Sequence, residues 1–458
     1  MRNHLEPEVS LMGNDMTMPS ATQSPPRGGL RRNRDFHIFW IGETISLFGA
    51  EVSLLALPLT ALVVLGADAA DLGLLRFVEY LPFLALALPL GVLVDRSRRH
   101  PLLVIANSAR ALLVGVIPVL AALGWLSMSW LVVLALGIGT FTVLFDLCLP
   151  AYLPKFVASE DLLSANGRVS MSQAAAEVAG PGLFGLLVQW LTAPLCLALN
   201  AGSYLVSVLS LLLIKRPEPA PARVVGTPWQ DLYDGLRFLV RSRLMRAVTL
   251  AGSLYNLAWA LFQTAFLVYM NKILGFNVGI VLAVGAAGGL AGAACAPWLT
   301  RRLPVGVTYL AAAAAIAVPA LLIPAVTGPR TTLALVDTAL LVLMNGGLAV
   351  FSVLTATLRQ SVTPDGLMGR VVAGYRALVF GGISLGGLIT AWLGSLAGPR
   401  ALLWVAGLFF LSALAPILLS PVPRLRGFGT ADSPSSGTGS AEEERGAERS
   451  PDPEEAGS

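Results

Sequence analysis

Successive apolar segments, each long enough to cross a lipid bilayer, constrain this chain more than any other feature of its sequence. A bilayer-spanning helix needs about 20 apolar residues at about 1.5 Å each, and such segments follow one another from about residue 36 to residue 420. The predicted fold class is an all-α integral membrane protein with twelve transmembrane helices. The helices are placed at residues 38–65, 73–94, 102–122, 129–150, 166–191, 194–214, 246–270, 277–299, 306–327, 332–355, 370–395 and 400–420.

The composition favours a membrane protein and argues against a water-soluble one. Of the 458 residues, 55% are hydrophobic and 13% are charged, and the mean hydropathy is +0.73. Soluble proteins carry about 25% charged residues. The net charge of +4 would suggest nucleic-acid binding only in a soluble protein, so no nucleic-acid partner is expected. Cys148, Cys196 and Cys295 lie in apolar segments, which indicates free buried thiols and not a disulfide framework.

Polar segments divide the chain into five parts. Residues 1–35 lack the apolar core of a signal peptide, and residues 421–458 are acidic and nearly without apolar side chains, so both are predicted to be disordered. The longest internal connection, residues 215–245, separates two sets of six helices. We therefore expect an N-terminal six-helix bundle at residues 36–214 and a C-terminal one at residues 246–420.

The distribution of Lys and Arg predicts the orientation in the membrane. All but five of the 31 Lys and Arg lie in the termini, in the even-numbered connections or in the first two turns of the helices that border them. Three of the five, Lys272, Arg330 and Arg400, lie in connections on the opposite side, and the other two lie inside predicted spans. By the positive-inside rule, both termini and the linker between the halves are expected to be cytoplasmic. The expected location is the cell membrane (plasma or inner), with multiple passes through the bilayer.

A repeated pattern indicates that the two halves are pseudo-symmetric. Gly167-Arg168-Val169 after the fourth predicted helix recurs as Gly369-Arg370-Val371 after the tenth. The helices that follow carry glycines in corresponding places, namely Gly180, Gly182 and Gly185 in the fifth helix and Gly381, Gly382, Gly386 and Gly387 in the eleventh. Internal repeats of this kind are typical of secondary transporters, whose substrate site lies between the halves near the bilayer midplane. A duplication without transport is the alternative.

The connection after the second predicted helix carries a charged motif. It reads Gly91-Val-Leu-Val-Asp95-Arg96-Ser-Arg98-Arg99 and resembles the G-x-x-x-D-R-x-G-R-[KR] loop of the major facilitator superfamily. The resemblance implies that Gly91, Asp95, Arg96 and Arg99 form a conformational latch, because a carboxylate at a helix end can pair with arginines and cap a neighbouring helix. Arg98 stands where the family has its second glycine. The alternative is that the arginines only set the topology.

Further segments between residues 36 and 420 resemble the drug-efflux branch of that superfamily, which includes macrolide and siderophore exporters. They are SLFGAEVSLLALPLTALVVLGA, FDLCLPAYLPKFV, LLSANGRVSMSQAAAEVAGPGLFGLL and LRQSVTPDGLMGRV. Gly180, Pro181 and Gly185 resemble the antiporter motif of the fifth helix, where small residues permit close helix contact and proline interrupts the backbone ladder. A packing kink is the alternative. The arginine that drug–proton antiporters of the family often carry in the fourth helix is absent from residues 129–150.

Charged residues inside predicted spans are candidates for function, because each costs about 2.5–3.5 kcal/mol at the bilayer centre. They are Glu43, Glu51, Arg76, Glu79, Arg110, Asp146, Glu177 and Asp337. Arg76 and Glu79 are three residues apart and are expected to neutralise each other. Glu51 and Glu177 have no partner on their own helix, and they are the first candidates for proton coupling because desolvation favours the protonated form of a carboxylate. Glu79 and Arg110 complete the proton-coupling candidates, and an ion pair with Arg110 is the alternative for Glu51 and Glu177.

The predicted seventh helix mixes aromatic and amide side chains, which suits a site for amphipathic organic molecules. The candidates for a substrate cavity are Tyr255, Asn256, Trp259 and Gln263. Helix packing and anchoring at the membrane interface are the alternative for each of them.

The sequence lacks the signatures of an ATP-driven pump or an enzyme. None of its three lysines follows a glycine, so a phosphate-binding loop G-x-x-x-x-G-K-[ST] cannot be written, and its histidines and cysteines show no metal-ligand spacing. No ATP, metal, cofactor or catalysis is expected, and the proton gradient is the expected energy source. We expect export of amphipathic, drug-like small molecules by alternating access with proton antiport. The alternative is a facilitator or exporter of a siderophore, sugar or lipid without proton coupling.

Overall fold

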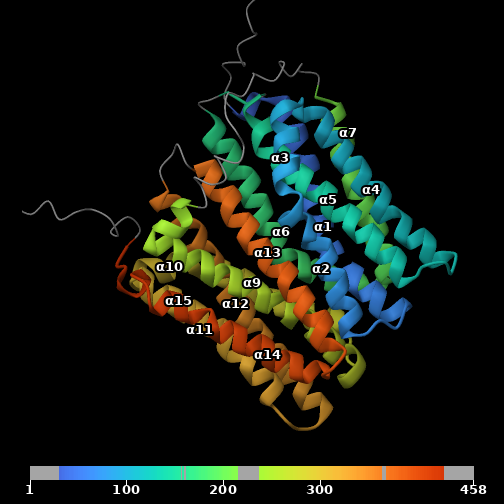
Figure 1. The fold of residues 1–458 in the computed structure, drawn as a ribbon, viewed down its shortest axis with the longest axis vertical. Helices are drawn as coiled ribbons and strands as arrows, with labels where there is room; N and C mark the ends of the chain where they lie inside the picture. The colour runs from blue at the N-terminus through green and yellow to red at the C-terminus, as the bar shows by residue number, and fades with distance from the viewer. Residues whose placement is uncertain (1–29, 156, 159–160, 215–236, 364–367, 428–458) are drawn as a thin grey trace, which may run out of the picture.

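The computed structural model describes residues 30–427 except residues 156, 159–160, 215–236 and 364–367. Throughout these described residues the regular elements are helices. Figure 1 shows them in two groups, one drawn from blue to green and the other from yellow to red, which meet along α6, α13 and α2. The all-α class predicted from the sequence is therefore confirmed.

The N-terminal half consists of seven helices that make six passes. They are α1 (Arg34–Val64), α2 (Ala69–Ala85), α3 (Ala87–Arg96), α4 (Arg99–Ala122), α5 (Met128–Tyr152), α6 (Leu162–Trp190) and α7 (Ala193–Leu212). α7 packs against α1 and α4, and α5 packs against α2 and α4. α2 and α3 together form the second pass.

The C-terminal half also makes six passes. Its helices are α9 (Arg243–Val268), the π-helix η4 (Tyr269–Leu274), α10 (Val278–Arg302), α11 (Val305–Ala325), α12 (Arg330–Val362), α13 (Met368–Gly394), α14 (Pro399–Ser412) and α15 (Leu414–Leu418). η4 continues α9, and α15 continues α14 after a single residue. The twelve passes agree with the predicted number. We call the end of the bundle where α1 begins the terminal end, and the end where α1 finishes the far end.

The second pass is broken, whereas the sequence predicted one continuous helix at residues 73–94. Leu86 ends α2 with φ −111° and ψ −8°, and α3 begins at the next residue. The proline three positions on, Pro89, has no amide hydrogen to donate to the Ala85 carbonyl. The regular ladder therefore stops at Ala85, although the Leu90 amide still donates to the Leu86 carbonyl at 3.0 Å.

Ordered structure begins before the predicted boundary at residue 36. Leu30 is buried, and α1 starts at Arg34. Asn33 caps this helix, because its side-chain oxygen accepts a hydrogen bond from the Phe36 amide at 3.1 Å. The prediction that residues 1–35 are disordered is therefore wrong for residues 30–35, and residues 1–29 lie outside the described part of the chain.

The boundary at residue 421 is also misplaced. A short 3₁₀ turn, η6 (Val422–Arg424), packs against α11, and the Gly306 amide donates to the Leu425 carbonyl at 2.9 Å. Val422 and Leu425 are buried, so two apolar side chains anchor this segment where the sequence predicted a disordered tail. Within the predicted linker, residues 237–241 are helical and α9 has begun by Arg243, while residues 215–236 and 428–458 lie outside the described residues.

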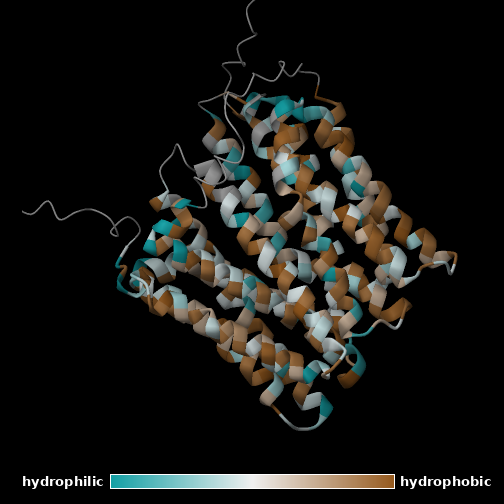
Figure 2. Ribbon diagram, viewed as in Figure 1, coloured by the Kyte–Doolittle hydropathy of each residue, from teal (hydrophilic) through white to brown (hydrophobic). Residues whose placement is uncertain are grey.

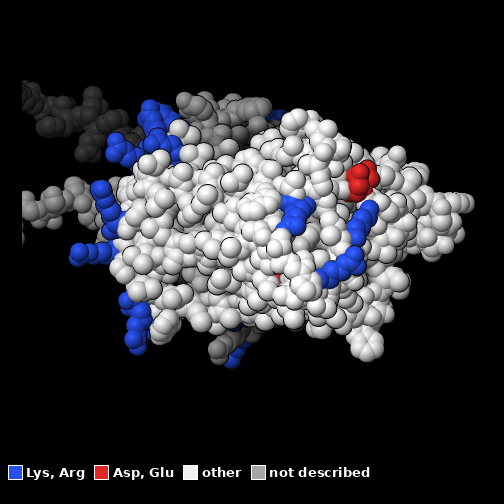
Figure 3. All heavy atoms as spheres, turned by 90° about the horizontal axis from the view of Figure 1, so that it is seen from below, with Lys and Arg blue, Asp and Glu red and all other residues white. Residues whose placement is uncertain are grey.

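The outer surface of the bundle suits contact with lipid. Ten helices are long and apolar enough to cross a membrane, counted over the described residues. Hydrophobic residues run along the helices and hydrophilic ones gather near their ends in Figure 2. Figure 3 shows one face with charged side chains at its left edge and near and right of its centre, and with uncharged surface between these two groups. The two passes outside the set of ten are α6 and the α2–α3 pair, in which the break leaves helices of 17 and 10 residues, each shorter than the 18 residues that the count requires.

Two helix pairs hold the halves together. α2 packs against α13, and α6 packs against α10. The contact between α6 and α10 depends on small residues, because a side chain at Gly185 would collide with the Gly279 carbonyl and the Ala283 amide. Each pair joins one helix of the N-terminal half to one of the C-terminal half.

Candidate transport cavity

A cavity lies between the two halves of the bundle. The empty space in and around it, including space open to solvent, amounts to about 780 Å³. Helices of both halves line it: α1, α2 and α6 from the first, and α9, α10 and α12 from the second. The walls are mainly apolar, with Arg76, Glu79, Gln263 and Asn345 among the few polar side chains.

A polar cluster on one wall of the cavity joins the two halves. Arg76 Nη1 lies 3.2 Å from Glu79 Oε2, which confirms the neutralising pair predicted from their spacing. The other terminal nitrogen of Arg76 donates a hydrogen bond to the Gln263 side-chain oxygen on α9. The Arg76 guanidinium also lies 5.7 Å from the centre of the Tyr80 ring. Gln263, predicted as a cavity residue, therefore lines the cavity and receives a donor from the opposite half.

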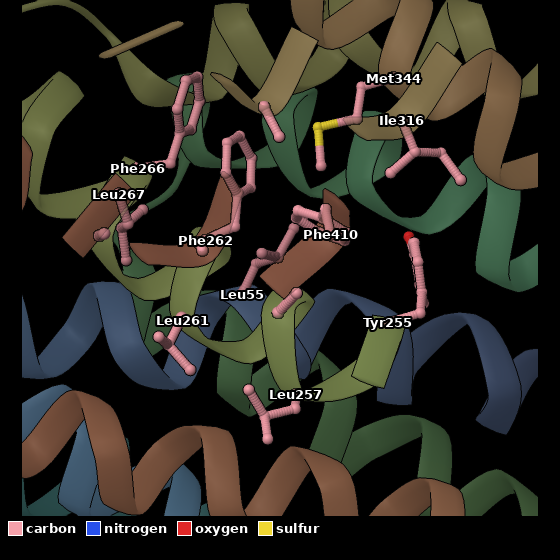
Figure 4. Packing of buried hydrophobic residues seen from close by; sticks show 14 of the residues in the cluster. Leu55, Tyr255, Leu257, Leu261, Phe262, Phe266, Leu267, Ile316, Met344 and Phe410 are labelled. Carbon is pink, nitrogen blue, oxygen red and sulfur yellow. The ribbon is translucent and has the colours of Figure 1, made fainter. Parts of the chain in front are cut away.

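Aromatic side chains of α9 form much of the wall that the C-terminal half contributes. The rings of Trp259 and Phe262 are stacked with centroids 6.0 Å apart, and those of Phe262 and Phe266 are 5.3 Å apart. All three residues line the cavity, and Figure 4 shows Phe262 and Phe266 beside Leu267. The predicted cavity residue Trp259 is thus placed in the wall. This wall can contact flat apolar groups, while Arg76, Glu79 and Gln263 offer polar contacts.

Tyr255 and Asn256, the other two predicted cavity residues, do not line this cavity. Tyr255 is buried and stacks on Trp259 and Phe351, and its hydroxyl lies beside Ile316 in Figure 4. The Asn256 side chain donates to the Gly252 carbonyl one turn earlier at 2.9 Å. The prediction is wrong for both residues: a helix rises about 1.5 Å per residue, and they lie one to two turns before Trp259 and Gln263 on α9, nearer the terminal end than the cavity.

Glu51 lies where α1 meets α6. A side chain at Gly180 of α6 would collide with Cβ of Glu51, so the two helices touch at this point. The charges that act on Glu51 are those of Glu177 on α6 and Arg76 on α2. The predicted coupling residues Glu51 and Glu177 are therefore neighbours, and Glu177 lies three residues from the glycine that permits their approach.

Glu177 is the more exposed of the two acids. Its carboxylate accepts a hydrogen bond from the Gln173 amide at 3.1 Å, and Arg376 of α13 acts on it electrostatically. The other members of the helix motif lie further along α6: Pro181 lines the cavity, and Gly185 touches α10. The motif predicted from the family resemblance thus faces both the cavity and the opposite half.

Arg110 does not pair with Glu51 or Glu177, so that predicted alternative is wrong. Within the described structure neither acid forms an ion pair with it. Arg110 is 5% exposed and lies between the rings of Phe145 and Tyr204, 4.2 and 4.5 Å from their centres. The acid on which it acts is Glu43, whose partners the sequence did not predict.

The charged motif between α3 and α4 is only partly described. Gly91 lies in α3, where a Cβ atom would meet open space, so no close contact requires glycine there. Arg96 ends α3 and Arg99 begins α4. The side chain of Asp95 lies outside the described part of the structure, so the latch stays a prediction.

Each end of the interface between the halves carries one polar contact that sequence analysis missed. At the far end, Lys272 of η4 donates to the carbonyls of Gly66 and Ala67, at 2.9 and 2.7 Å, just beyond α1. Toward the terminal end, Arg376 of α13 lies 3.7 Å from Asp146 of α5. These residues are far apart in sequence, so no local spacing signals their contact.

Proteins that are similar to this chain in sequence are named as exporters. The chain is 26% identical over 343 residues to the enterobactin exporter EntS of Salmonella choleraesuis (strain SC-B67), covering 74% of this chain and 80% of that relative. The EntS of Escherichia coli O1:K1 / APEC shows the same identity and coverage.

Solved structures resemble the fold at low identity. A bacterial homologue of the iron transporter ferroportin in an inward-facing state superposes with a TM-score of 0.65 at 18% identity, covering 84% of this chain and 98% of that one. The nucleoside transporter NupG gives a TM-score of 0.64 at 12% identity, covering 84% and 98%. The family model of the Major Facilitator Superfamily matches residues 39–387. This multi-pass membrane protein belongs to the Major Facilitator Superfamily.

Proposed function

We propose that this transporter exports amphipathic small molecules, of the drug or antibiotic type, by alternating access with proton antiport. The observation that carries the proposal is the cavity between the halves, whose lining combines stacked aromatic rings with a small polar cluster. An apolar pocket with a few placed polar groups fits a ligand that is apolar over most of its surface.

Alternating access is supported by the contacts that join the halves. Lys272 bridges them at the far end, and Asp146 and Arg376 bridge them toward the terminal end. Each contact can break while the helices within a half stay packed, because its members belong to different halves. Rocking of one half against the other would then open the cavity to each side in turn.

Proton antiport is supported by the position of the Glu51 and Glu177 pair beside the cavity. Two carboxylates that act on each other at the contact of α1 and α6 favour a state in which one of them carries a proton. One proton that moves down about 100 mV yields about 2.3 kcal/mol, enough for a concentration ratio of roughly forty. We also propose that the protein lies in the cell membrane with both termini on the cytoplasmic side.

The experiment is efflux of a panel of fluorescent and antibiotic compounds from cells that express the chain, with and without a protonophore. We expect protonophore-sensitive efflux that Glu51→Gln or Glu177→Gln abolishes. The control is Thr357→Val, because this hydroxyl on α12 bonds to the backbone of its own helix at Val353 and lies away from the cavity residues. Efflux that survives both substitutions and the protonophore would exclude proton antiport through these acids.

A second candidate is an exporter of a siderophore without proton coupling. Its support is the similarity to relatives named as enterobactin exporters. The same cells, loaded with enterobactin, would show export that is indifferent to the protonophore.

A further inference from the structure

We infer that Glu43 is a proton-binding site that controls the ion pair between Asp146 and Arg376, and so links protonation to opening of the terminal end. The inference deepens the proposed transport function and rests on it. Glu43 lies inside the N-terminal half and is not among the residues that line the cavity. It would act on the interface between the halves and not on the substrate.

A chain of hydrogen bonds connects Glu43 to Arg110. Arg110 donates to the Asn107 side-chain oxygen, and the Asn107 amide donates to the Ser207 hydroxyl at 2.8 Å. The Ser207 hydroxyl in turn donates to Glu43 Oε2 at 3.5 Å. Each donor points from the cation toward the carboxylate, so the chain in this arrangement suits a deprotonated Glu43.

Burial gives this chain its electrostatic strength. Glu43, Asn107, Arg110 and Ser207 are each 5% exposed or less. A charge in such a site needs an opposite charge, because water is excluded from it. Among the described residues, Arg110 forms no ion pair within 4.0 Å. The charge that balances it is therefore that of deprotonated Glu43, on which Arg110 acts electrostatically.

Asp146 is the acid that can replace Glu43 as the partner of Arg110. It follows Phe145, whose ring lies 4.2 Å from the Arg110 guanidinium, and both Arg110 and Asp146 act electrostatically on Glu43. Arg110 Nε is buried without a hydrogen-bond partner among the described groups, so the guanidinium has a donor to spare. Arg110 and Arg376 therefore compete for one carboxylate.

The protonation state of Glu43 decides this competition. While Glu43 is charged, it balances Arg110, and Asp146 is free to hold Arg376 of the other half. A proton on Glu43 removes that balance, and Arg110 then attracts Asp146 away from Arg376. Because this ion pair crosses the interface between α5 and α13, its loss favours separation of the halves at the terminal end.

The other charged and titratable groups near Glu43 do not offer the same switch. The elements packed around α1 present Arg168 on α6 and Tyr204 on α7, while Glu177 of α6 and the Arg76–Glu79 pair of α2 lie toward Glu51, two turns further along α1. Arg168 lies over the Trp40 ring, 5.7 Å from its centre, and Tyr204 lies under Arg110. The charges that act on Glu43 are those of Arg110 and Asp146.

The test measures the distance between spin labels on the terminal-end connections, at Ser97 and Leu303, in purified protein without substrate. The three native cysteines are replaced by alanine. For the parent protein we expect a shift to longer distances as the pH falls from about 8 to about 5. Glu43→Gln should give the longer distance at both pH values.

Two further variants serve as a second test and as a control. Asp146→Asn removes the carboxylate that binds Arg376 and should also give the longer distance at both pH values. Thr142→Val is the matched control on α5, because this hydroxyl bonds to the Ile138 carbonyl of its own helix, and it should follow the parent protein. Distances that stay pH-dependent in the Glu43→Gln protein would overturn the inference.

Infrared spectroscopy covers the case in which Glu43→Gln does not fold. The parent protein should gain a carboxylic acid band on acidification, and Glu43→Asp should move the frequency of that band. An unmoved band would assign the proton to another residue and overturn the inference. Neither measurement needs a transported compound. A failure to export any compound would therefore count against the proposed function but would not affect the result for Glu43.

Discussion

Removing either Arg76 or Glu79 alone should destabilise the fold, whereas removing both should cost much less. Their side chains are 7% and 18% exposed and their charged atoms are 3.2 Å apart. Removing one partner of a buried pair costs about 3–5 kcal/mol, because the other charge is left without compensation. Glu79 borders a cavity that opens to solvent, so we take the lower limit, about 3 kcal/mol, for Arg76→Gln.

The size of this effect sets the assay. A loss of about 3 kcal/mol lowers the ratio of folded to unfolded protein roughly a hundredfold. The free energy of unfolding is measured by denaturant titration in mixed micelles for the parent, Arg76→Gln, Glu79→Gln and the double variant. We expect the double variant to recover most of the loss and to retain efflux, because no unpaired charge remains in it. Arg330→Gln, at the exposed first residue of α12, is the control and should stay within about 0.5 kcal/mol of the parent.

The double variant decides between two roles of Glu79. If Glu79 is neutralised by Arg76, the double variant is stable and transports. If Glu79 is itself the acid that exchanges protons, the double variant is stable but efflux is lost. A double variant that is as unstable as Arg76→Gln would refute the reasoning, since it would mean that the two charges do not compensate each other.

Three further predictions concern packing and closure. Gly386→Leu should slow efflux but still allow membrane insertion, because a Cβ atom there would lie 2.5 Å from the Leu257 carbonyl, whereas Gly202→Leu, at an open position, should leave efflux unchanged. Normal efflux in a well-expressed Gly386→Leu protein would count against close sliding of α13 on α9. Lys272→Met should lengthen the spin-label distance between the halves at the far end, and an unchanged distance would show that its two carbonyl contacts do not hold that end closed. Val422→Asp should lower the melting temperature of the purified protein, because it places a charge at a fully buried apolar position against α11; equal melting would mean that the segment does not stabilise the fold.

Sequence analysis predicted the class, the number of passes and the approximate ends of the helices. The spans follow from local hydropathy and the fixed rise of a helix, so neighbouring residues contain the information needed. Even so, the break at Leu86 was missed, since Pro89 lies in an apolar run that continues past it. The buried Val422 was missed because two apolar residues in a polar segment leave no periodic signal.

In the candidate site, too, some residues were predicted correctly from local spacing and others were not. Arg76 and Glu79 were paired correctly because a helix places residues three apart on one face. Trp259 and Gln263, four residues apart, were found in the cavity wall, while Tyr255 on the same helix was misassigned to it.

The partners across helices were decided by tertiary structure alone. Arg110 acts on Glu43, Asp146 contacts Arg376, and Gln263 accepts from Arg76. Such contacts depend on how each helix is rotated about its axis and how far it is shifted along its neighbour. Side-chain packing sets both quantities, and a difference of one residue turns a side chain by about 100° around the helix. The sequence by itself therefore determined which segments cross the membrane and which charges they carry, and the packing of the two halves determined which of those charges meet.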